Sequence, residues 1–89
     1  MEFEYDPEKS ASNLKKHGID FIEAQRLWAG FVVEIEAPHP PEMRYLCIGT
    51  IDGEYWSAII KYVGMRRRII SVRRSTEKES LYASKATSR

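Results

Sequence analysis

The feature that most constrains the fold of this chain is a pair of strand-like segments joined by Asp52-Gly53. Residues 43–51 and 54–63 are rich in β-branched and aromatic side chains, which are typical of strands. Asp and Gly tolerate the positive φ angles that a two-residue hairpin turn requires. The sequence therefore predicts a long antiparallel hairpin against which the remaining elements must pack.

The N-terminal segment predicts a short strand followed by a helix. Residues 2–5 alternate polar and aromatic side chains, a strand pattern. Asp6-Pro7 then indicates a helix start, because the carboxylate accepts unpaired amide protons and proline fits the first helical position. The helix is expected to run to His17, since Gly18 supplies the left-handed residue that ends many helices.

A second helix and a further strand are expected next. Asp20 opens the helix with Glu23 in the capping-box position, and Gly30 ends it. Its apolar side chains recur at spacings of three and four and share one face: Phe21, Ala24, Leu27 and Trp28. Residues 31–35 then predict a strand. The prolines of residues 38–41 lack amide donors, so we expect an exposed loop there.

The C-terminal segment predicts an arginine-rich strand and a last helix. A reversal at Gly64-Met65 leads into a strand over residues 67–73. Regular alternation there would place Arg68 and Arg74 on one face and Arg67 and Arg73 on the other. Thr76 and Glu79 form a capping box for a helix through about Ala83 or Lys85, with Leu81 and Tyr82 as its main apolar contacts and a frayed end.

These elements predict an α+β fold in which helices pack on a mainly antiparallel sheet. With 89 residues, we expect a single domain over residues 1–89. No apolar stretch approaches the roughly 20 residues of a membrane-spanning helix, and the acidic N-terminus does not resemble a signal peptide. We therefore expect a cytoplasmic protein that does not contact membranes. The single cysteine, Cys47, cannot form an internal disulfide and is expected in the core.

Charge is unevenly distributed along the chain. The net charge is only +1, which alone does not indicate a nucleic-acid-binding protein. Five arginines nevertheless fall within nine positions: Arg66, Arg67, Arg68, Arg73 and Arg74. The sequence therefore predicts a local basic patch.

Four groups of residues, in this order, resemble the BrnT family of toxins. They are Phe3-Glu4-Tyr5-Asp6 with Lys9 and Asn13; Lys16-His17-Gly18-Ile19 with Phe21 and Ala24; Arg44 with Gly49; and Arg68 to Arg74 with Glu79 and Tyr82. The resemblance implies a RelE-like ribonuclease fold, toxicity through RNA cleavage and translation arrest, and neutralisation by a BrnA-like antitoxin. It also implies that operator DNA is contacted only through the antitoxin, in a hetero-oligomer of the two proteins.

Metal-independent RNA cleavage needs a base for the 2′-hydroxyl, cations for the charge that grows on the phosphate, and an acid for the leaving oxygen. Arginine suits the second task because its planar guanidinium donates two parallel hydrogen bonds to phosphate oxygens. The candidates are Arg44, Arg68, Arg73 and Arg74. The alternative is that these arginines are solvated or paired with carboxylates.

The proton-transfer groups are less sharply defined. His17, with Lys16 beside it, can transfer protons at neutral pH, or it can serve as a cation that stabilises a helix C-terminus. Tyr82 can act as an acid, as a stacking platform or as a packing residue. Glu79 fits a capping role, and Glu4 becomes a possible base if arginines surround it. His39 has no partner at ligand spacing, so neither a metal nor another cofactor is expected.

Two other functions fit the same residues. The arginines can hold nucleic acid without cleaving it, in which case affinity would fall steeply with salt while RNA stayed intact. Alternatively, the main task of the chain is to hold an antitoxin on operator DNA. Trp28 and Trp56 are expected in the core or at the antitoxin interface.

Overall fold

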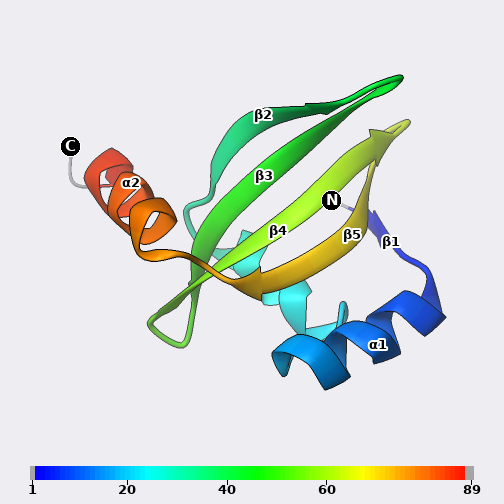
Figure 1. Cartoon of the computed structure of the whole chain (residues 1–89), viewed down its shortest axis with the longest axis horizontal. Helices are drawn as coiled ribbons and strands as arrows, with labels where there is room; N and C mark the ends of the chain where they lie inside the picture. The colour runs from blue at the N-terminus through cyan, green and yellow to red at the C-terminus, as the bar shows by residue number, and fades with distance from the viewer. Residues whose placement is uncertain (1, 88–89) are drawn as a thin grey trace.

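A five-stranded sheet in the order β1-β5-β4-β3-β2 forms the centre of the molecule (Figure 1). The computed structural model describes residues 2–87. Its elements are β1 (Glu2–Glu4), α1 (Pro7–His17), the 3₁₀ helix η1 (Glu23–Ala29), β2 (Val33–His39), β3 (Glu42–Ile51), β4 (Glu54–Val63), β5 (Arg66–Arg74) and α2 (Glu77–Thr87). The pairing of β1 with β5 is parallel and that of the other neighbours is antiparallel, which confirms the predicted α+β class.

The predicted hairpin and its turn are confirmed. β3 and β4 meet at Asp52 and Gly53, whose φ angles are 52° and 81°. Ile51 therefore pairs with Glu54, and this pair fixes the register of the whole β3–β4 ladder. The alignment of these two long strands is therefore set by the two turn residues.

The helix caps also follow the sequence. Asp6 Oδ1 accepts a 2.9 Å hydrogen bond from the backbone N–H of Glu8, and Gly18 ends α1 with φ 77°. Asp20 Oδ1 accepts from the backbone N–H of Glu23 at 2.8 Å. The predicted second helix is a 3₁₀ helix, η1, which begins only at Glu23, so Asp20 caps the turn that precedes it. Phe21 of that turn and Ala24 and Leu27 of η1 are buried in the core.

The boundaries of β2 differ from the prediction. The strand begins at Val33 and continues to His39, so the expected loop over residues 38–41 is wrong for its first half. Pro38 pairs with Met43 in the ladder. β2 is an edge strand, the position in a sheet where a proline is tolerated, because an edge strand has a neighbour on one side only. The turn is confined to Pro40-Pro41, which are joined by a cis peptide bond.

The core lies between one face of the sheet and the segment from α1 to η1. It includes Ile19 and the η1 side chains together with Ala58, Ile60, Ile69 and Val72 from the sheet. Cys47 has no exposed surface, as predicted, and burial raises the pKa of its thiol to about 12. α1 and α2 lie at opposite ends of the molecule (Figure 1), and none of the described helices is long and apolar enough to cross a membrane.

Buried Asn13 fastens α1 to the edge of β5. Its Nδ2 donates hydrogen bonds to the backbone oxygens of Ile19 at 2.8 Å and Val72 at 2.9 Å. Its Oδ1 accepts from the backbone N–H of Val72 at 3.2 Å. β1 covers only the first part of β5, so Asn13 satisfies the β5 backbone where no strand does.

β5 contains a β-bulge that the sequence pattern does not reveal. Ile60 pairs with Ile69, whereas the preceding Ile59 pairs with Ser71. Ile70 is therefore an extra residue, and the alternation of faces is reversed beyond it. As a result, Ile69 and Val72 both point into the core although three positions separate them.

α2 ends at Thr87, beyond the predicted Lys85. The expected packing of Leu81 and Tyr82 is wrong, because both are 54% exposed whereas Ala83 is the buried contact at 2%. The predicted fraying concerns residues 88–89, which lie outside the described residues.

Candidate functional site

The bulge divides the arginines of β5 between the two faces of the sheet. The cross-strand pairs are Arg68 with Lys61, Arg73 with Ser57, Arg67 with Tyr62 and Arg74 with Trp56. Paired residues point to the same face, and Ser57 and Lys61 share a face because four positions of regular strand separate them. Arg68 thus lies on the face of Arg73. The expectation that Arg68 and Arg74 share a face is wrong, because it assumed a regular strand.

Three cations lie side by side on this face, and we call Arg44, Lys61 and Arg68 the cation row. Lys61 pairs directly with Arg68. The β3–β4 ladder, continued by one residue from the pair Tyr45 and Ile60, places Arg44 opposite Lys61. Since adjacent strands lie about 5 Å apart, the three residues cross the sheet within about 10 Å. The row is near enough to engage one phosphate group or two successive ones.

A carboxylate lies at each end of the cation row. Glu42 accepts from Arg44 Nε at 2.7 Å and from Lys61 Nζ at 3.1 Å. These hydrogen bonds, that of Arg44 first, hold the pKa of Glu42 below its ordinary value. Glu4 lies 3.0 Å from Arg68 and 3.7 Å from Arg66. Glu4 thus pairs with two arginines, which is the condition that the sequence analysis set for its candidacy, and its role as base stays a prediction.

Arg73 lies on the face of the cation row, but its guanidinium is already bound to a carboxylate of α2. Its guanidinium donates to both oxygens of Glu79, at 2.7 and 2.8 Å. Glu79 also accepts from the Thr76 backbone N–H and from Ser57 Oγ, each at 2.9 Å, which confirms its capping role. The Arg73 hydrogen bond chiefly lowers the pKa of Glu79 to about 2. Arg73 lies roughly 13 Å along the sheet from the row, so it positions α2 and does not share a phosphate with Arg68.

Two other β5 arginines, Arg67 and Arg74, lie on the opposite face. Arg74 pairs with Glu54 at 3.1 Å and stacks over Trp56, with its guanidinium carbon 5.4 Å from the ring centre. Arg67 similarly lies 5.4 Å from the Trp28 ring centre. Both tryptophans are partly buried against the core, as one of the two expectations for them states. Arg74 is therefore separated from the cation row by the thickness of the sheet.

Lys16 and His17 form a third location. Both are exposed in the last turn of α1, where the helix dipole favours cations. They line a pocket of about 270 Å³ together with Asn13 and the bulged residue Ile70. The structure therefore places them beside the edge of β5 and not in the cation row. Their catalytic role stays a prediction.

An apolar groove separates the sheet from α2 on the face of the cation row, and we call it the α2 groove. It has a volume of about 200 Å³ and is lined by Ile35, Leu46 and Ile48 from the sheet and by Lys78, Glu79 and Tyr82 from α2. Leu46 follows Arg44 by two positions, so the groove begins about 7 Å from the cation row. The structure thus juxtaposes a cationic and an apolar surface.

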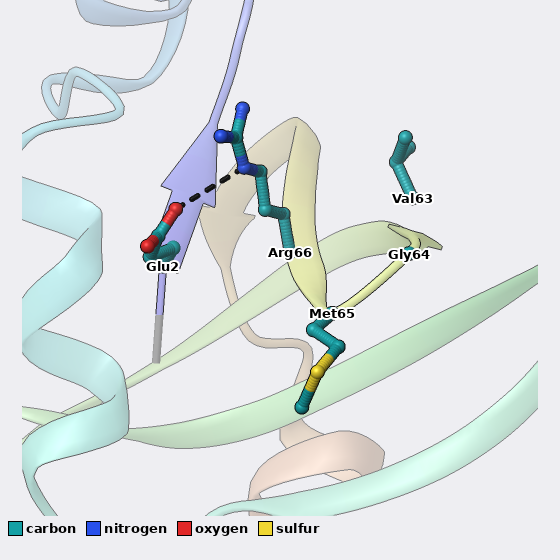
Figure 2. Close-up of a pocket in the computed structure, with 5 residues that line it drawn as sticks. All are labelled: Glu2, Val63, Gly64, Met65 and Arg66. Atoms are coloured by element: carbon teal, nitrogen blue, oxygen red, sulfur yellow. Dashed lines mark ion pairs between the residues drawn. The ribbon is translucent and has the colours of Figure 1, made fainter.

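A separate pocket of about 720 Å³ lies at the β4–β5 turn. Figure 2 shows Glu2 and Arg66 joined across it, with Nε of Arg66 3.1 Å from the Glu2 carboxylate. The turn residue Met65 is 90% exposed. Its two charged lining residues neutralise each other in an ion pair, and the other lining residues are apolar. The lining therefore offers no reactive group, and the pocket is not a candidate active site.

Lys61 is the member of the cation row that the sequence analysis missed, and Glu42 beside it was missed as well. The signal for Lys61 was present, because the two-residue turn at Asp52-Gly53 fixes which residues of the hairpin face each other. Counting back equally along both strands from that turn places Lys61 opposite Arg44. Within residues 2–87, no three His, Cys, Asp or Glu side chains gather into a group able to hold a metal ion.

Comparison with known proteins identifies a family that matches most of this chain. Residues 5–79 match the family model described as the ribonuclease toxin BrnT of type II toxin-antitoxin systems. No curated protein matches the chain. The matched segment contains the strands β2 to β5, and with them the whole cation row, but it begins just after β1.

Proposed function

This chain belongs to the BrnT family of ribonuclease toxins of type II toxin-antitoxin systems, and from that premise we propose that it cleaves RNA without a metal ion and so arrests translation. The single observation that carries the proposal is the cation row. It places two guanidinium groups and an ammonium group side by side on one face of a rigid sheet.

The cation row supplies binding and charge stabilisation. Glu42 accepts from Nε of Arg44, and a guanidinium group has two further nitrogens with which it can donate to a phosphate. A phosphodiester that bridges Arg44 and Lys61 receives charge-assisted hydrogen bonds from both. When the 2′-oxygen attacks, negative charge grows on the phosphate oxygens, and fixed cations stabilise that transition state more than the ground state. Arg68 extends the same contact along the row.

Two groups are candidates for the proton transfer in this reaction. Glu4 contacts Arg68 and is the carboxylate at the far end of the row from Glu42. We propose Glu4 as the first base to test. His17 with Lys16 remains the second, provided that the RNA passes the edge of β5. Replacing His17 with Gln keeps a hydrogen-bonding group but removes titration, so cleavage unchanged by that variant excludes His17 as the base.

The family also implies a cognate antitoxin. We propose that a BrnA-like antitoxin binds this chain in the cytoplasm, blocks cleavage in a hetero-oligomer and carries the complex to operator DNA. Inducing the chain alone should stop bacterial growth, and co-inducing the adjacent antitoxin gene should restore it. Normal growth after induction alone would contradict a toxic role.

The direct experiment is RNA cleavage by the purified chain in EDTA, with variants on the two faces of β5. Lys61→Ala and Arg68→Ala should each lower the cleavage rate by about 10- to 100-fold, because each removes a charge from the developing phosphorane. Arg74→Ala is the matched control, since it removes an arginine from the same strand on the opposite face. Equal loss in all three variants would contradict the site, and RNA that is bound tightly but never cut would indicate a binding module.

A further inference from the structure

The α2 groove has the size and surroundings of a subsite for one flat ring system. Its volume of about 200 Å³ lies below the range of about 300–1,000 Å³ that is common for larger ligands. Three aliphatic side chains of the sheet, Ile35, Leu46 and Ile48, form one wall, and the Tyr82 ring stands on the other. Tyr82 is 54% exposed although it is an aromatic residue beside an apolar wall.

The helix that carries Tyr82 is held firmly in place. Glu79, one turn before Tyr82, is fixed by two hydrogen bonds from Arg73 and by the capping contact with Thr76. Tyr82 follows Glu79 by three positions and therefore lies on the same face of α2, toward the sheet. The groove is thus pre-formed between α2 and the sheet, which lowers the entropy lost on binding.

The neighbouring charges favour RNA as the occupant. The cation row begins about 7 Å from the groove, along the strand from Leu46 to Arg44. A nucleotide has both parts that this arrangement requires, a ring for the groove and an anion for the row. Among the described residues that line the groove, Glu79 is the one carboxylate; it already accepts from Arg73, Thr76 and Ser57, so it does not repel a phosphate strongly.

We propose that the α2 groove binds the nucleobase next to the phosphate held by the cation row, stacked on Tyr82. This inference rests on the proposed function, because it names a substrate subsite of the same face. Stacking is tolerant of sequence, since every base has a π-face. The groove therefore contributes affinity and places the phosphate, with little selection among the four bases.

The test measures binding of the purified full chain to a short 2′-O-methyl oligonucleotide, which has no free 2′-hydroxyl to attack. Tyr82→Ala should weaken binding by about 5- to 150-fold, the loss of about 1–3 kcal/mol of stacking. Tyr82→Phe should bind within about 2-fold of the wild type, because the ring is kept. Leu81→Ala is the matched control, since Leu81 is also 54% exposed on α2 but does not line the groove.

Salt dependence separates this subsite from the cation row. Lys61→Ala should reduce the slope of log affinity against log salt by about 1, whereas Tyr82→Ala should leave the slope unchanged. An oligonucleotide that lacks one base at the bound position should bind wild type and Tyr82→Ala equally. If Tyr82→Ala binds RNA like the wild type, the subsite is refuted, whether or not that variant loses antitoxin binding. If instead Lys61→Ala alone leaves binding and cleavage unchanged, the proposed cation row fails.

Discussion

Replacing Asn13 with alanine tests how α1 is attached to the sheet. The side chain makes three hydrogen bonds to backbone groups, of 2.8, 2.9 and 3.2 Å, and only 6% of the residue is exposed. Each such bond contributes about 1 kcal/mol, and each buried group left without a partner costs about 1–3 kcal/mol. In the variant, a water molecule that enters the space left by the side chain can hydrogen-bond to some of these backbone groups, which offsets part of the cost of leaving them unpaired. We therefore expect Asn13→Ala to lower the free energy of unfolding by about 3–5 kcal/mol.

Urea unfolding followed by tryptophan fluorescence measures this loss, with Ser12→Ala as the control on the exposed neighbouring position. Hydrogen exchange should also become faster at the backbone amide of Val72, which donates to Asn13. A loss below about 1 kcal/mol, or unchanged protection of Val72, would refute the reasoning that Asn13 replaces a strand at this edge.

Three further outcomes follow from the contacts described. Glu79→Gln should lower stability at pH 7 by about 2 kcal/mol, after allowance for the exposure of Arg73. Because the folded pKa of Glu79 is about 2 and its ordinary value is 4.5, the difference from wild type should persist above pH 4.5 and vanish as pH falls toward 2 in parallel urea titrations. Gly49→Ala should cost about 1–3 kcal/mol in the same assay, since its Cβ would lie 3.1 Å from the backbone oxygen of Phe31 and 3.2 Å from Leu27; an unchanged midpoint would show that both neighbours can move. Glu42→Gln should tighten RNA binding at low salt, because it removes an anion that shares the cation row; weaker binding would show that Glu42 chiefly orients the cations.

Local chemistry explains what the sequence predicted correctly. The turn at Asp52-Gly53 and the caps at Asp6, Asp20 and Glu79 depend on residues within a few positions of one another, so the pattern alone indicated them. The β2 boundary failed because Pro38 is tolerated only at a sheet edge, and edge position is a property of the whole fold.

The site was predicted less completely for the same reason. Arg44 and Arg68 were named in the sequence analysis. The division of the other β5 arginines between the two faces of the sheet depended on the bulge at Ile70, which arises because Ile69 and Val72 both pack into the core. Tyr82 was named without its environment, because the groove beside it exists only where α2 meets β2 and β3. Lys61 was within reach, because the hairpin register was already implied by its turn.

The additional residue at position 70 has a practical consequence for comparing this strand with others. Two chains with the same arginine spacing present different guanidinium groups to a substrate if only one of them has the bulge. Functional equivalence on β5 should therefore be judged by the residue opposite on β4, Lys61 for Arg68 and Ser57 for Arg73. Deleting Ile70 would remove the bulge and leave a regular strand, in which Ser71, Val72 and Arg73 keep their partners on β4 and therefore their faces, so the division of the arginines should survive the deletion.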